Sequence, residues 1–238
     1  EEAGKCITSG SNNIYFGKDA GRYANTGILN VAIGYQAGCC VCTDGNYNVN
    51  IGTLAGAKLV SQSCSVNIGQ CAGYSDFPGD SNVFIGSCAG WRGGCGGSNI
   101  AIGDGSGQNM KATTRSVFLG EQAGRWNQGT DNIAMGRCSL AGNSSAQDDN
   151  TGYFNVAIGY LAGKNVTTGS SNVSLGNCAG CAINTGFYNI ILGDCAGKQI
   201  TTGRHNVVMG KDAMSSGGGQ GADCTIAIGY AAGCLISF

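Results

Sequence analysis

The sequence has too little charge for a nucleic-acid-binding protein. Charged residues make up 11% of its 238 residues, the formal net charge is -1, and no run of lysine or arginine occurs. The electrostatic footprint of a nucleic-acid binder is therefore missing. The most apolar segment, IAIGYAAGCLISF at 226–238, is shorter than the roughly 20 residues that a membrane-spanning helix needs. We therefore expect neither a nucleic-acid partner nor membrane insertion.

Histidine is almost absent, which argues against an enzyme. The single histidine, His205, lies in a variable position of a repeat that contains no cysteine. A Ser-His or Cys-His pair would have to be built around that one residue. The short glycine motifs of the chain are explained by its repeat and carry no weight as nucleotide-binding signals. We expect no enzymatic activity, no catalytic residues and no cofactor.

Metal-binding patterns are also lacking. The cluster CCVC at 39–42 has no second cysteine pair at a zinc-site spacing and no histidine near it. Calcium-dependent β-rolls need regularly spaced aspartates, whereas the aspartates here are scattered over different repeats. No metal site is predicted.

Glycine and cysteine are abundant. The chain has 44 glycines, 14 cysteines and one proline, and 42% of its residues are hydrophobic. This composition is typical of an ordered protein with many tight turns rather than of a disordered one. The cysteine content favours an oxidising, extracellular setting. Because the chain begins at Glu1 without a methionine, we expect a processed or excised piece.

A five-residue core of the type NVAIG recurs thirteen times, and we number its positions slots one to five. The spacing is about 17 residues, and two insertions, 137–152 and 215–224, lengthen loops without breaking the phase. Slot two is always Val or Ile, slot four is Ile, Leu, Met or Phe, and slot five is always Gly. Period-two alternation puts slots two and four on one face, which we predict to be the core. Stacked coils about 4.8 Å apart bury such a face continuously. The predicted fold is all-β, a parallel β-solenoid (β-roll) of about 13 coils forming one repeat domain over 1–238.

Slot one is asparagine in ten copies, from Asn13 to Asn206. In-register asparagines can hydrogen-bond from coil to coil, as amide ladders do in stacked sheets. Alternatively, asparagine simply suits the corner conformation.

Slot three is never charged and is predicted to face away from the coil interior. An outward stripe with so little charge resembles a surface covered by a partner. We therefore expect lateral self-association, most simply as a homotrimer. The alternative is that the stripe only reflects β-propensity. The apolar members of the stripe are Tyr15, Ala32, Phe84, Ala101, Phe118, Ala134, Ala157, Ile191, Val208 and Ala227.

Cysteines recur two residues after the slot-five glycine. This places Cys71 beside Cys88, and Cys178 beside Cys195, at a separation that a disulfide can span. We predict these two coil-to-coil bridges, with reduced, apolar thiols as the alternative. The C-x-x-C spacing of Cys178 and Cys181 then follows from where two repeat positions fall, and is not interpreted as a redox motif. Asn143, in the first insertion, is the candidate glycosylation acceptor.

Ice binding is a further hypothesis, because threonines share one position in four consecutive coils. These are Thr151, Thr168, Thr185 and Thr202, and no second row runs parallel to them.

The unit NVAIGYQAGxxxxTGxxN resembles the 17-residue repeats of phage tail-fibre proteins that end in a self-cleaving chaperone domain. More distantly, it is similar to the heads of trimeric autotransporter adhesins. The strongest matches are 30–38, 155–163 and 167–176. The resemblance implies a trimeric shaft or head of an extracellular or virion-surface fibre, adhesive toward a cell-surface receptor. Because repeats run to Gly233 without a polar cap, a head-to-tail filament is the alternative.

Overall fold

The computed structural model describes residues 2–39, 45–58, 62–74, 79–92, 96–142, 150–216 and 221–234. These residues contain thirteen strands and no α-helix, and each strand coincides with slots two to four of one repeat. The chain divides into two compact units, Glu1–Ser116 and Val117–Phe238. The first unit contains β1 (Ile14–Phe16), β2 (Val31–Ile33), β3 (Val49–Ile51), β4 (Val66–Ile68), β5 (Val83–Ile85) and β6 (Ile100–Ile102). The second contains β7 (Val117–Leu119), β8 (Ile133–Met135), β9 (Val156–Ile158), β10 (Val173–Leu175), β11 (Ile190–Leu192), β12 (Val207–Met209) and β13 (Ile226–Ile228).

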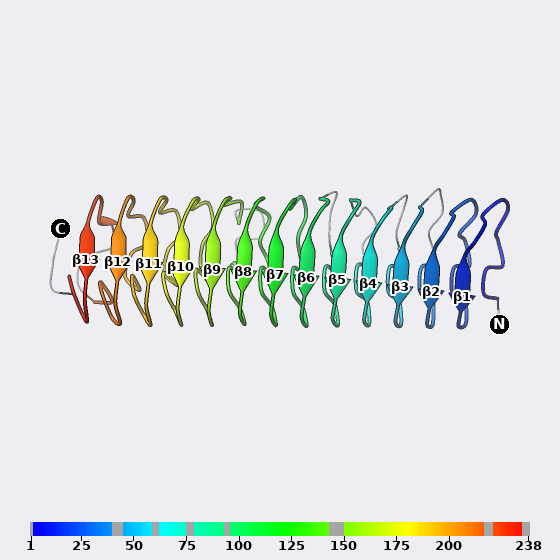
Figure 1. The fold of residues 1–238 in the computed structure, drawn as a ribbon, viewed down its shortest axis with the longest axis horizontal. Helices are drawn as coiled ribbons and strands as arrows, with labels where there is room; N and C mark the ends of the chain where they lie inside the picture. Colours follow the sequence, from blue (N-terminus) through cyan, green and yellow to red (C-terminus); the bar gives the residue numbers. More distant parts are fainter. Residues whose placement is uncertain are drawn as a thin grey trace. The chain divides into compact units, whose positions relative to one another are not determined.

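Within each unit the strands pair in parallel and in the order of the chain, slot against slot. Val31 of β2 lies opposite Val49 of β3, and Val173 of β10 lies opposite Ile190 of β11. Figure 1 shows each strand followed by a loop that returns the chain to the start of the next strand. This is the predicted parallel β-solenoid. The prediction that 1–238 form a single domain stays a prediction, since the same coil builds both units.

The two insertions leave the register unchanged, as predicted. Ile133 of β8 pairs with Val156 of β9 across the first insertion, and Val207 of β12 pairs with Ile226 of β13 across the second. The extra residues therefore lengthen loops between strands that remain in phase.

The slot-one asparagines form the coil-to-coil ladder. The backbone N–H of Asn30 donates to Oδ1 of Asn13 at 2.8 Å, and Nδ2 of Asn30 donates to the carbonyl of Gly45 at 2.8 Å. In the second unit the amides also bond to each other, with Nδ2 of Asn206 donating to Oδ1 of Asn189 at 2.9 Å. One buried side chain thus satisfies the backbone of its own corner and that of the next coil. The ladder hypothesis is confirmed.

The faces of the strands are the reverse of those predicted. Slot three points into the coil, and slots two and four point out. The asparagine ladder explains this arrangement. The ladder buries slot one, and side chains two residues apart lie on the same face of a strand, so slot three also points inward. In the predicted self-association stripe Tyr15 is half-buried, and the other nine residues are at most 4% exposed. That prediction was wrong for Tyr15, Ala32, Phe84, Ala101, Phe118, Ala134, Ala157, Ile191, Val208 and Ala227.

The interior is narrow and filled largely by small side chains. Three residues after the slot-five glycine, at slot eight, Ala37, Ala179 and Ala196 are fully buried. A second apolar row, which the sequence analysis missed, lies seven residues after that glycine and includes the buried Ile183 and Ile200. Close packing of this kind leaves the β-branched residues of slots two and four no room inside.

Slot-five glycines allow the coils to approach closely. Gly34 has a φ of +131°, and a Cβ placed on it would lie 2.6 Å from the carbonyl oxygen of Gly52 in the next coil. Both the backbone conformation and the contact exclude a side chain at this position.

Candidate functional site: an outward apolar sheet face

Slots two and four form an outward face, which we call the apolar face. All its residues are Val, Ile, Leu, Met or Phe, and none is buried. In the first unit the face consists of Ile14, Phe16, Val31, Ile33, Val49, Ile51, Val66, Ile68, Val83, Ile85, Ile100 and Ile102. In the second it consists of Val117, Leu119, Ile133, Met135, Val156, Ile158, Val173, Leu175, Ile190, Leu192, Val207, Met209, Ile226 and Ile228.

The side chains of the apolar face are held outward by the register of the sheet. Slot two of each strand lies opposite slot two of its neighbour, and slot four opposite slot four, so the face consists of two continuous apolar rows in each unit. Ile133 and Met135 are each 38% exposed, although their strand is paired on both sides. Strands that are apolar on both faces are typical of parallel sheets covered on both faces. Here the described part of the chain covers only the inner face.

A polar row flanks the apolar face on the side of slot six, the residue after the glycine. In the second unit Nε of Arg137 lies 3.4 Å from Oε2 of Glu121, and Nδ2 of Asn177 donates to Oδ1 of Asp194 at 2.8 Å. On the other flank Tyr188 stacks on His205, with ring centroids 5.2 Å apart. An apolar centre between polar and aromatic margins is the usual anatomy of a protein–protein interface.

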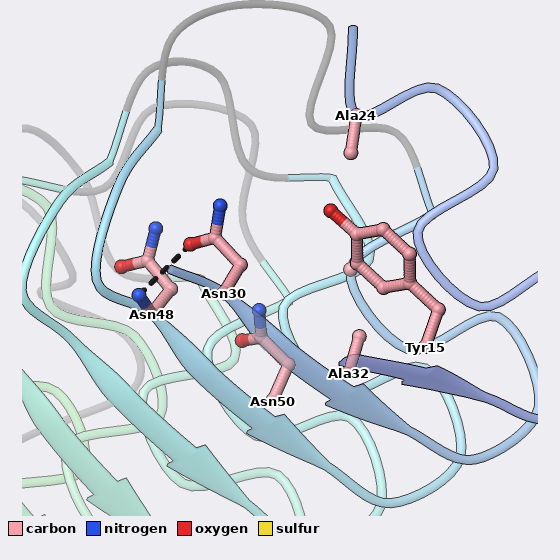
Figure 2. A pocket seen from close by; sticks show the side chains of 7 residues that line it. Tyr15, Ala24, Asn30, Ala32, Asn48 and Asn50 are labelled. Carbon is pink, nitrogen blue, oxygen red and sulfur yellow. Dashed lines mark hydrogen bonds between the residues drawn. The ribbon is translucent and has the colours of Figure 1, made fainter. Parts of the chain in front are cut away.

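A small internal cavity lies beside β1 and β2 in the first unit. Figure 2 shows Tyr15, Asn30 and Asn48 around it, with the backbone N–H of Asn48 donating to Oδ1 of Asn30 at 2.9 Å. Its volume is about 10 Å³, and the Tyr15 hydroxyl has no hydrogen-bond partner among the residues that the structure describes. Burial raises the pKa of Tyr15 above its ordinary value of 10.0. A space of this size holds about one water molecule, so it is no ligand site.

The cysteines predicted to form bridges are thiols in this structure. Cys71, Cys88, Cys178 and Cys195 are all free, so neither bridge is present among the described residues. The members of each pair are nonetheless neighbours. Burial and then Cys88 raise the pKa of Cys71, whereas burial, Asp194 and then Cys178 raise that of Cys195. The formation of the two coil-to-coil disulfides on oxidation stays a prediction.

Other predicted positions are spread over the surface. Thr151, Thr168, Thr185 and Thr202 are exposed, as a surface row requires, and ice binding by them stays a prediction. His205 is exposed and packs against Phe187 and Tyr188. Asn143, like Cys40 and Cys42 of the CCVC cluster, lies outside the described residues.

Over the described ranges, no group of three or more His, Cys, Asp or Glu side chains has an arrangement that could hold a metal ion. A search of the same ranges found no helix with the length and apolar character needed to span a membrane.

The strands, their register and the buried ladder define this chain as a β-solenoid repeat protein. No protein family, curated protein or solved structure matches it. Its function has therefore to be inferred from its surfaces, of which the apolar face is the most unusual.

Proposed function

We propose that this protein is a non-enzymatic structural protein whose copies associate side by side into the shaft or head of an extracellular or virion-surface fibre. The contact is the apolar face. A homotrimer, in which three such faces meet at one axis, is the simplest closed assembly of this kind. The proposal keeps the self-association expected from the sequence and moves it from slot three to slots two and four.

The observation that carries this proposal is the composition of slots two and four. Every described strand presents two apolar side chains outward, and no charged or polar residue interrupts either row. Exposed apolar rows that continue from strand to strand are costly in water and mark surfaces that a partner covers. The interior needs no partner, since its own side chains and the asparagine ladder already fill it.

In such an assembly the loops outside the apolar face would remain available to a receptor. Exposed aromatic residues such as Tyr23 and Tyr153 lie in these loops, 39% and 51% exposed. Adhesion to a cell-surface receptor, which the resemblance to fibre and adhesin repeats implies, would use this surface.

Analytical ultracentrifugation and electron microscopy of the purified protein test the proposal together. Lateral association predicts a concentration-independent trimer and particles of uniform size. Long filaments would instead favour end-to-end stacking of subunits. A monomer at micromolar concentration would contradict association through the apolar face.

A further inference from the structure

Two positions of each coil face each other across the turn that follows the strand. Counting on from the slot-five glycine, they are slot seven and slot ten. The backbone N–H of slot ten donates to the carbonyl of slot seven, at 3.3 Å for Arg125 and Gln122 and at 3.3 Å for Cys181 and Cys178. Slot seven also takes a positive φ, which is 56° at Gln122 and 51° at Cys178. The two turns therefore have the same backbone conformation.

The side chains of slots seven and ten meet in two coils where both are polar. Nη1 of Arg22 lies 3.5 Å from Oδ1 of Asp19, and Nη1 of Arg125 lies 3.5 Å from Oε1 of Gln122. In the coil after β10 the same two slots hold Cys178 and Cys181. Cys178 acts on the Cys181 thiol both as a nearby charge and as a side-chain hydrogen-bond partner, so the two thiols are neighbours within one turn.

Slot seven also contacts slot seven of the adjacent coil. Sγ of Cys138 lies 3.8 Å from Oε1 of Gln122, one coil away. By the same register Cys195 is the neighbour of Cys178, and its backbone N–H donates to the carbonyl of Asn177 at 2.8 Å. Cys178 thus has one thiol partner in its own turn and a second in the next coil.

We propose that Cys178, Cys181 and Cys195 form a three-thiol exchange site. In this site oxidation joins Cys178 to Cys181, and the bond can then move to Cys178 and Cys195. The C-x-x-C spacing, which the sequence analysis set aside as a coincidence of the repeat, is then a dithiol in its own right. The site does not depend on the proposed fibre function.

The chemistry is ordinary thiol–disulfide exchange with an external disulfide such as oxidised glutathione. The Cys178 thiolate attacks one glutathione sulfur, forms a mixed disulfide and releases one reduced glutathione. The Cys181 thiolate then attacks Sγ of Cys178 and releases the second. In the exchange step the Cys195 thiolate attacks Sγ of Cys178, and Cys181 leaves as a thiolate that takes up a proton.

Protonation controls how fast this exchange runs. Burial raises the pKa of Cys181, Cys178 raises it further, and Lys198 lowers it. Burial and the Asp194 carboxylate raise the pKa of Cys195. Because only thiolates attack, exchange at the site should be slow at neutral pH and faster under mildly alkaline conditions.

The chain contains its own matched control. Cys71 and Cys88 also occupy slot seven in adjacent coils, but their slot-ten residues are Tyr74 and Trp91. This pair can form only a bond between coils. Comparing the two sites shows how much the turn, as opposed to the stacking of coils, favours disulfide formation.

The test is disulfide mapping of the full chain after equilibration in a series of glutathione redox buffers at mildly alkaline pH. Free thiols are then alkylated, and the protein is digested by chymotrypsin, which cleaves after Tyr188 and so separates Cys195 from Cys178 and Cys181. In wild type we expect the Cys178–Cys181 bond to form at a lower ratio of oxidised to reduced glutathione than the Cys71–Cys88 bond needs. Cys195→Ser should keep that bond, and Cys181→Ser should divert it to Cys178–Cys195.

Two wild-type results would overturn the proposal. One is Cys181 fully alkylated at every glutathione ratio, with Cys178 joined only to Cys195, because the Cys178–Cys181 bond would then never form. The other is alkylation of all three thiols in a buffer where Cys71 and Cys88 are already joined. Failure of Cys181→Ser to form the Cys178–Cys195 bond would overturn the exchange step.

Discussion

Oδ1 of Asn172 accepts two hydrogen bonds from Asn189 in the next coil, one from its backbone N–H at 3.1 Å and one from Nδ2 at 2.9 Å. Nδ2 of Asn172 in turn donates to the carbonyl of Gly186 at 2.8 Å. Asn172→Ala should therefore leave several buried groups unpaired and lower the free energy of unfolding by about 3 kcal/mol. Urea denaturation followed by circular dichroism measures this change.

Asn177→Ala is the matched control for the ladder. Asn177 is exposed and bonds the Asp194 side chain of the next coil, so its loss should cost less than about 1 kcal/mol. Equal destabilisation by the two alanine variants would contradict a special contribution from the buried ladder.

The inside and outside of the sheet can be tested with two adjacent isoleucines. Ile191 is fully buried, whereas Ile190 is 43% exposed on the apolar face. Ile191→Ala should destabilise the chain by about 2–4 kcal/mol, because it leaves a cavity in the interior. In dilute protein Ile190→Ala should cost less than about 1 kcal/mol. If Ile190→Ala is the more damaging variant in the denaturation assay, the assignment of the two faces is wrong.

The same two residues show how far the sequence allowed the fold to be predicted. Repeat length, parallel register and the asparagine ladder all follow from the spacing, and the structure confirms them. The spacing did not predict which face of the strand points inward. Slots two and four are apolar and slot three is uncharged, so alternation divides the strand into two faces but does not show which of them is buried. Slot one contained the missing signal, because a continuous ladder of asparagines that bond to the backbone of their own corner lies inside the coil, and slot three lies on the same side.

The thiol contacts were equally hard to predict. In-register spacing correctly places Cys195 near Cys178. The contact between Cys178 and Cys181 depends on the positive φ of slot seven, which folds slot ten back toward it. Cysteine is not a residue type that usually indicates this conformation.

Close approach between coils predicts a strong effect at slot-five glycines. Gly193 has a φ of +133°, and a Cβ there would lie 2.6 Å from the carbonyl oxygen of Gly210. Gly193→Ala combines a strained backbone with a steric clash and should destabilise the chain by roughly 3 kcal/mol or more. Gly221 has room for a Cβ, its nearest atom being 3.6 Å away, and Gly221→Ala should be tolerated. Thermal denaturation of both variants provides the comparison, and similar midpoints would contradict the account of coil spacing.

The buried Tyr15 hydroxyl predicts a dependence of stability on alkaline pH. Its pKa in the folded chain is raised above the ordinary value of 10.0, so the unfolded chain loses this proton first. The resulting stability is fully present below pH 10 and is lost as pH rises through the folded-state pKa. Tyr15→Phe should therefore lose less stability between pH 9 and about pH 11 than wild type. Urea denaturation at each pH measures this difference, and equal losses of stability in the two proteins would contradict a buried Tyr15 hydroxyl.

The mass of the native particle distinguishes a trimer joined through the apolar face from a monomer. Sedimentation equilibrium would compare wild type with Ile133→Lys/Ile190→Lys, which places two charges on the face, and with Thr168→Lys/Thr185→Lys, which places two charges on exposed loops. We predict a trimer for wild type and for the threonine variant. The isoleucine variant should be a folded monomer with an unchanged circular dichroism spectrum, because both side chains point away from the coil interior. A monomeric wild type, or a trimer that survives the two lysines on the apolar face, would contradict the account.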